Sequence, residues 1–178
     1  MTHTVLIANK IAAKDVDAYL RPFVAQQNMD NGNVMTLNTV SSGSSVEAWV
    51  PTVPTTGSLS GLWMVMEPTL PFLPSGTNIY SGLGTVRDFY VSASQVATCF
   101  KPQVGDIITV TADAFTSGTA PTAGQYCVAV NAAFTLTAQA SGSAGQTWQC
   151  REVLYIPFAD GTIGTGRITA YRLECIIQ

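Results

Sequence analysis

The stretch YRLECII, residues 171–177, decides the fold class because every second side chain in it is apolar. The apolar set shares one face of an extended chain and consists of Tyr171, Leu173, Cys175 and Ile177. Arg172 and Glu174 lie between them and face the opposite way. A period of two residues is that of a β-strand with one buried and one solvated face. The sequence therefore predicts a half-buried strand here.

The same period recurs upstream through the second half of the chain. Apolar residues keep to one face in 108–114 and again in 126–138, where we expect one long strand or two joined by a bend. The apolar phase changes near Arg151, which predicts a β-bulge. Turn residues at 117–118, 141–145 and 160–166 separate these segments at hairpin-like intervals. This spacing predicts a mainly β fold, a single antiparallel β-sandwich or a small β-barrel.

The first half of the chain divides near residue 27. After the turn signal DNG at 30–32, strand patterns continue, and LWMVM at 62–66 is apolar on both faces, as in a strand covered on each side. Before it, charged residues gather, Asp15 could cap a short helix, and Pro22 would interrupt it. We therefore expect an N-terminal, partly helical arm at 1–27 and a β domain at 28–178. The arm would pack on its own domain or reach onto a neighbouring subunit.

Charged residues make up only 11% of the 178-residue chain, with a formal net charge of −3, against about a quarter in ordinary soluble domains. A surface so poor in charge suits a protein held against neighbours, because net charge keeps free monomers apart. Lys and Arg are scattered and form no basic stripe, so nucleic acid is not an expected partner. No apolar run is long enough to cross a bilayer and no signal peptide is evident, so we expect no membrane partner and synthesis in the cytoplasm.

The four cysteines lie far apart, without a CxxC or CxxH pair: Cys99, Cys127, Cys150 and Cys175. This spacing argues against zinc or an iron–sulfur cluster. We expect buried, inert thiols, with two disulfides as the alternative.

No catalytic constellation is evident. Nucleophilic catalysis with a histidine base would depend on His3, the single histidine, which we expect on a mobile terminus. The acids available to a two-carboxylate glycosidase are dispersed: Glu47, Glu67, Asp88, Asp106, Glu152 and Glu174. Asp106 follows a glycine before a strand and is explained as a turn residue. We therefore expect no enzyme, no cofactor and no metal site.

The tryptophans allow two interpretations. Trp49 falls on the polar phase of its strand, where it could stack on a sugar ring. The favoured interpretation places Trp49, Trp63 and Trp148 in the core or at a subunit interface.

Four segments, taken in order, resemble small structural proteins of tailed-phage heads, known as decoration, cement or auxiliary capsid proteins. The segments are DNGNVMTL (30–37), LWMV (62–65), VGDIITVT (104–111) and GQYCV (124–128). The resemblance covers about residues 28–178 and lies in the order of turns and strands. It implies a compact β domain, no catalysis, and the major capsid protein and further copies of the chain as partners.

The expected function is thus a non-enzymatic virion protein that decorates or stabilises the outer surface of a phage capsid. Net acidity favours the outer face, because packaged DNA would repel carboxylates on the inner one. The expected assembly contacts are Val5, Leu6, Ile7, Ile11 and Trp49. The alternatives are a carbohydrate-binding β module and a main shell or tail-tube subunit.

Overall fold

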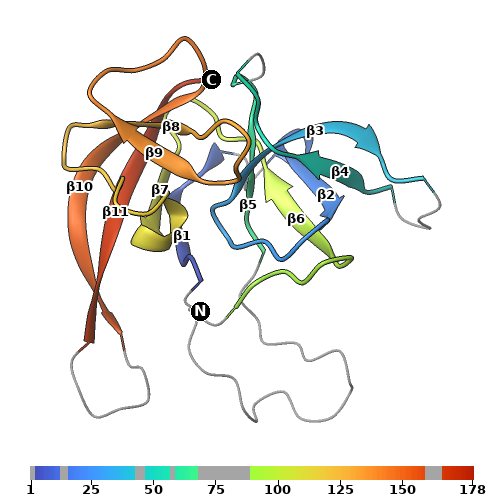
Figure 1. Ribbon diagram of the computed structural model, residues 1–178, viewed down its shortest axis with the longest axis horizontal. Coiled ribbons are helices and arrows are strands. Elements are labelled where there is room, and N and C mark those ends of the chain that lie inside the picture. The colour runs from blue at the N-terminus through green and yellow to red at the C-terminus, as the bar shows by residue number, and fades with distance from the viewer. Residues whose placement is uncertain (1–2, 13–15, 43–46, 57–58, 68–88, 159–165) are drawn as a thin grey trace.

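The computed structural model describes residues 3–12, 16–42, 47–56, 59–67, 89–158 and 166–178. The described chain is mainly β, as the sequence predicted, and forms two sheets, one of which closes into a five-stranded barrel (Figure 1). Three expected features lie outside the described residues: the helix cap at Asp15, Asp88, and the turn at 160–166 except for its last residue. No helix in the described part of the chain has the length and apolar character needed to cross a membrane.

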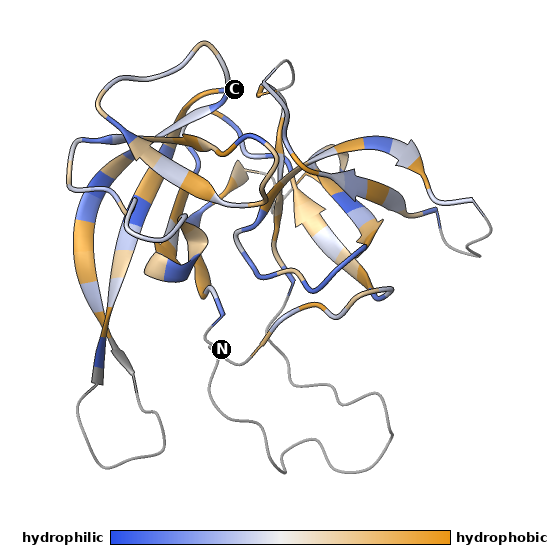
Figure 2. Ribbon diagram, in the orientation of Figure 1, coloured by the Kyte–Doolittle hydropathy of each residue, from blue (hydrophilic) through white to orange (hydrophobic). Residues whose placement is uncertain are grey.

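The open sheet has six strands in the order β1-β7-β11-β10-β8-β9, with all neighbours antiparallel. Its strands are β1 (Leu6–Lys10), β7 (Ile107–Thr111), β8 (Tyr126–Ala129), β9 (Leu136–Gln139), β10 (Thr147–Phe158) and β11 (Gly166–Ile177). Tyr171, Leu173 and Cys175 are buried, so the strand predicted from YRLECII is confirmed, but Ile177, expected on the same buried face, is 39% exposed at the end of the strand. Apolar and polar residues alternate along β10 and β11 (Figure 2). The bulge predicted near Arg151 is confirmed by a register shift between Cys150 and Glu152.

The barrel has the order β2-β4-β3-β5-β6. Its strands are β2 (Leu20–Val24), β3 (Val34–Val40), β4 (Trp49–Thr52), β5 (Trp63–Val65) and β6 (Val96–Phe100). β2 and β4 close it through a parallel pairing, an exception to the antiparallel arrangement expected.

Two hydrophobic clusters explain why LWMVM is apolar on both faces. The barrel cluster fills the barrel and includes Phe23, Met35, Trp63, Val65 and Cys99. The seam cluster lies between barrel and open sheet, joining Val34, Leu62, Met64 and Phe100 to open-sheet residues that include Ile108, Trp148 and Leu173. Successive residues of β5 therefore enter different clusters, because side chains alternate across a strand. A strand covered on both faces is confirmed.

The expected N-terminal helical arm is not what the structure shows. β1 is an edge strand of the open sheet and β2 belongs to the barrel. Between them the described residues include the 3-10 turn Asp17–Tyr19, η2, and a single further residue in 3-10 conformation, Ala12. Ile11 is buried in the seam cluster, and Phe23 is fully buried in the barrel. A short helix is marginal in water, whereas pairing along β7 satisfies backbone groups and buries apolar side chains. The division at residue 27 itself remains a prediction.

The segment 126–138 forms two antiparallel strands, β8 and β9, which is the second of the two alternatives expected. The turn between them contains Ala132 in the left-handed region, at φ 60°. The Ala132 N–H donates to the Pro54 carbonyl at 2.8 Å, and the Val34 N–H donates to the Phe134 carbonyl at 2.9 Å. The turn thereby connects the open sheet to the barrel.

Candidate functional site

The five expected assembly contacts differ widely in exposure. Ile7 is 40% exposed on the outer strand β1, whereas Val5 and Leu6 are half-buried and Ile11 is buried. Leu6 packs against the seam cluster. Ile7 is thus the member of the N-terminal group that is most available to a neighbour.

Trp49 is half-buried, and the Arg21 guanidinium covers its ring. The Arg21 Cζ lies 4.1 Å from the Trp49 ring centroid and 4.8 Å from that of Trp63, so the cation is sandwiched between two indoles. Trp63 and Trp148 are 7% and 1% exposed. This burial agrees with the interpretation that Trp63 and Trp148 belong to the core. In the described chain, no tryptophan ring is left uncovered for stacking against a sugar.

The four cysteines are free and buried, as expected. Burial raises the pKa of Cys99, Cys127 and Cys175 from 9.0 to about 12 in each case, and raises that of Cys150. The thiolate is the nucleophilic form, so these thiols are unreactive near neutral pH. They act as apolar core residues.

The acids expected to be structural have structural partners. Asp106 accepts hydrogen bonds from the Ala12 N–H at 2.6 Å and the Gln103 N–H at 2.7 Å, which confirms it as a turn residue. Glu67 accepts from the Thr98 N–H at 2.7 Å. On the solvated face of the hairpin β10–β11, Arg151 pairs with Glu174 at 2.6 Å and Arg172 with Glu152 at 2.7 Å.

Within the described residues, no group of three or more His, Cys, Asp or Glu side chains is placed to hold a metal ion.

His3 departs from the expectation of a mobile terminus. Its Nδ1 lies 2.6 Å from Asp30 Oδ1, its side chain is 14% exposed, and its ring stacks on Tyr90 at a centroid distance of 4.7 Å. The Thr4 N–H donates to the other Asp30 oxygen at 3.2 Å. The turn DNG, which the sequence indicated correctly, therefore anchors the N-terminal segment through the carboxylate of its first residue.

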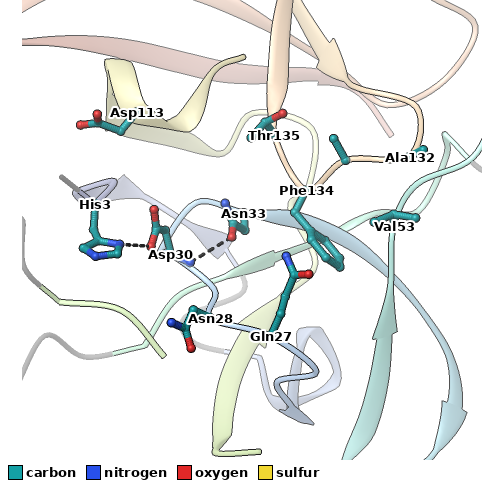
Figure 3. A pocket seen from close by; sticks show the side chains of 11 residues that line it. His3, Gln27, Asn28, Asp30, Asn33, Val53, Asp113, Ala132, Phe134 and Thr135 are labelled. Carbon is teal, nitrogen blue, oxygen red and sulfur yellow. Dashed lines mark hydrogen bonds and ion pairs between the residues drawn. The ribbon is translucent and has the colours of Figure 1, made fainter. Parts of the chain in front are cut away.

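His3 and Asp30 line a pocket of about 470 Å³ where barrel and open sheet meet (Figure 3). The other lining residues come from the segment of Asp30 and from three further segments, and are Gln27, Asn28, Asn33, Val53, Asp113, Ala132, Ala133, Phe134 and Thr135. Asp113 belongs to the 3-10 turn η4 (Ala112–Ala114). Polar groups and an apolar wall thus face the same space, which is typical of a small-molecule site.

The pocket suits binding better than nucleophilic catalysis. His3 and Asp30 have the arrangement of an orienting acid and a base, but the described residues of the lining include no serine or cysteine. The lining threonine, Thr135, has its Oγ1 3.0 Å from the Thr116 hydroxyl. A catalytic triad needs a nucleophile within hydrogen-bond reach of the imidazole.

Sequence reasoning missed this pocket because its walls come from widely separated segments. The one local signal is the amide-rich stretch QQNMDNGN at 26–33, which contributes Gln27, Asn28, Asp30 and Asn33. No family model, curated protein or solved structure matches the chain.

Proposed function

We propose that this chain is a non-enzymatic structural protein of a phage virion that decorates or stabilises the outer capsid surface. Its partners would be the major capsid protein and further copies of itself. The proposal combines the resemblance of the strand and turn order with a surface that is poor in charge and carries exposed apolar side chains.

The observation that carries the proposal is the outer half of the hairpin β10–β11. From Gly166 to Thr169, β11 pairs with β10 alone, for example through Tyr155↔Thr169 and Ile156↔Ile168, because its pairing with β7 begins only at Ala170. This two-stranded ribbon extends away from the rest of the open sheet (Figure 1). Tyr155 on it is 62% exposed. An isolated two-stranded ribbon is marginal in water, so contact with a neighbour would stabilise it.

The edge strand β1 supports the same proposal. The described residues place no strand on its outer side, and Ile7 is exposed on it. Open sheet edges pair readily with other chains. Repetition on a lattice would make individually weak contacts effective, because many identical sites act together.

The test is cosedimentation of the purified chain with phage heads assembled from the major capsid protein of the same genome. We expect saturable binding, and we expect Tyr155→Asp to weaken it by at least tenfold, about 1.4 kcal/mol, because the ribbon contact would bury a carboxylate. Ser141→Asp, which adds the same charge to an exposed loop position, is the control and should bind as the parent does.

Failure of the parent chain to bind such heads would overturn the proposal. Spontaneous assembly of the chain alone into shells or tubes would instead favour a main shell or tail-tube subunit.

A further inference from the structure

The pocket between barrel and open sheet has a chemistry that the proposed capsid contacts do not use. It is built around the QQNMDNGN loop and the β8–β9 turn, away from the exposed end of the β10–β11 ribbon (Figures 1 and 3). Backbone hydrogen bonds fix its walls, because the Ala132 N–H donates to Pro54 and the Phe134 carbonyl accepts from Val34. Ala132 is held in the left-handed region, which side-chain-bearing residues adopt at a cost. The pocket is therefore a defined part of the fold.

The charges in the pocket disfavour ionic ligands. Both oxygens of Asp30 are engaged, one by His3 Nδ1 at 2.6 Å and the other by the Thr4 N–H at 3.2 Å. Asp113, the other acidic residue of the lining, also has an interaction partner. Two carboxylates repel an anion, and the Asp30 oxygens already have hydrogen-bond partners within the protein. A neutral ligand fits best.

The amides supply hydrogen-bonding groups for such a ligand. The Asn28 Oδ1 accepts from the Ala93 N–H at 3.2 Å, and the Asn33 Oδ1 accepts from the Asp30 N–H at 2.9 Å. Each amide is thus held at its oxygen, which leaves its NH₂ group to donate. Gln27 is exposed at the pocket and can both donate and accept. The amide NH₂ groups on this side of the pocket would donate hydrogen bonds to oxygen atoms of a ligand.

An apolar wall adjoins these amides. Phe134 lies beside Gln27, and Val53 and Ala132 continue the wall (Figure 3). An aromatic ring next to amide donors matches a ligand that has hydroxyl groups at its edge and C–H groups on its face. A volume of about 470 Å³ lies within the usual range for small-molecule pockets, roughly 300–1,000 Å³.

We propose that this pocket binds a neutral saccharide, a mono- or disaccharide unit. The amides of Gln27, Asn28 and Asn33 bind its hydroxyl or ether oxygens, and the Phe134 wall contacts a face of the sugar ring. The site is independent of the tryptophans, which are buried or covered by Arg21. It is also independent of the virion role.

Saturation-transfer NMR on the full chain tests the proposal, with neutral hexoses, N-acetylhexosamines and their disaccharides alongside glucuronic acid and glucosamine as charged probes. We expect transfer to at least one neutral sugar and stronger transfer to it than to either charged probe. Gln27→Trp should abolish the signal by filling the pocket, and Gln27→Ala should weaken affinity about threefold to tenfold through loss of a neutral hydrogen bond.

Gln26→Trp and Gln26→Ala are the matched controls, because Gln26 is the exposed neighbour whose amide bonds to the Val24 carbonyl outside the pocket lining. Circular dichroism of all four variants checks that they fold. The proposal is overturned if no neutral sugar shows transfer at millimolar concentration, if a charged probe binds better, or if folded Gln27→Trp binds as Gln26→Trp does. None of these results would affect the cosedimentation test of the virion role.

Discussion

At the residue scale, Asp106 and His3 show which features of single side chains the sequence can reveal. Asp106 was predictable as a turn residue because it follows a glycine and precedes a strand, so its surroundings are local in sequence. His3 was not, because the carboxylate that holds it belongs to Asp30 and the ring that stacks on it belongs to Tyr90. The pocket could not be predicted from the sequence for the same reason, since the tertiary fold brings its lining residues together.

Replacement of Asp106 should destabilise the protein, because the residue is 4% exposed and its carboxylate accepts hydrogen bonds from two backbone N–H groups. We expect Asp106→Ala to lower the free energy of unfolding by about 2–4 kcal/mol, since hydrogen bonds to a charged group are worth about 1.5–3 kcal/mol each. Asp106→Asn keeps one oxygen acceptor and should cost less. Urea denaturation measures both values, and equal stability of Asp106→Ala and the parent would contradict the assigned role.

The buried thiols predict a loss of stability in alkaline solution. In the folded chain the pKa of Cys99 is raised from 9.0 to about 12 by burial, so between these values the unfolded state releases a proton that the folded state retains. Stability from this group is complete below pH 9 and falls as the pH rises toward 12.

The difference between the parent and Cys99→Ala isolates the contribution of Cys99 from every other effect of alkaline pH on stability. Urea denaturation at pH 8, 9 and 10 should show a shallower decline for Cys99→Ala than for the parent. Parallel declines would mean that Cys99 ionises in the folded chain as it does in the unfolded one.

At the element scale, the predictions that succeeded concern patterns within one strand. YRLECII was correctly predicted to have one buried face, and LWMVM was correctly predicted to have two. Both predictions succeeded because the two-residue period of a strand shows which faces are apolar. The N-terminal segment was assigned wrongly because the pairing partner of β1 is β7, about a hundred residues later, and such contacts leave no local pattern. The closed barrel depends on β2 joining β4 and β6, which is equally nonlocal.

The alternation along β1 predicts opposite effects for adjacent substitutions. Leu6 packs against the seam cluster, whereas Ile7 faces outward and is 40% exposed. We expect Leu6→Lys to destabilise the chain by about 2 kcal/mol or more through burial of an unpaired charge, and Ile7→Lys to change stability by less than about 0.5 kcal/mol. Thermal and urea unfolding distinguish the two.

Under the proposed function, Ile7→Lys should also weaken binding to phage heads without loss of fold, because a charged edge strand resists pairing. Equal destabilisation by both substitutions would show that β1 does not present alternate faces to core and solvent.

At the scale of the whole molecule, the two sheets depend on one another. The seam cluster draws side chains from both, and residues 1–27 contribute a strand to each. The low charge content leaves few groups to keep such molecules apart, and the exposed apolar residues lie on the β10–β11 ribbon, on β1 and at other surface positions. These features favour a molecule whose exposed apolar surfaces are covered by neighbouring subunits. This is the reason for the proposed location on a capsid.

Cryo-electron microscopy of phage particles that contain this chain tests that place most directly. The proposal predicts symmetrically arranged copies on the outside of the head, with the outer β10–β11 ribbon or the β1 edge in contact with an adjacent subunit. Particles that carry the chain only inside the head or in the tail, or copies whose ribbon and β1 edge both face solvent, would contradict it.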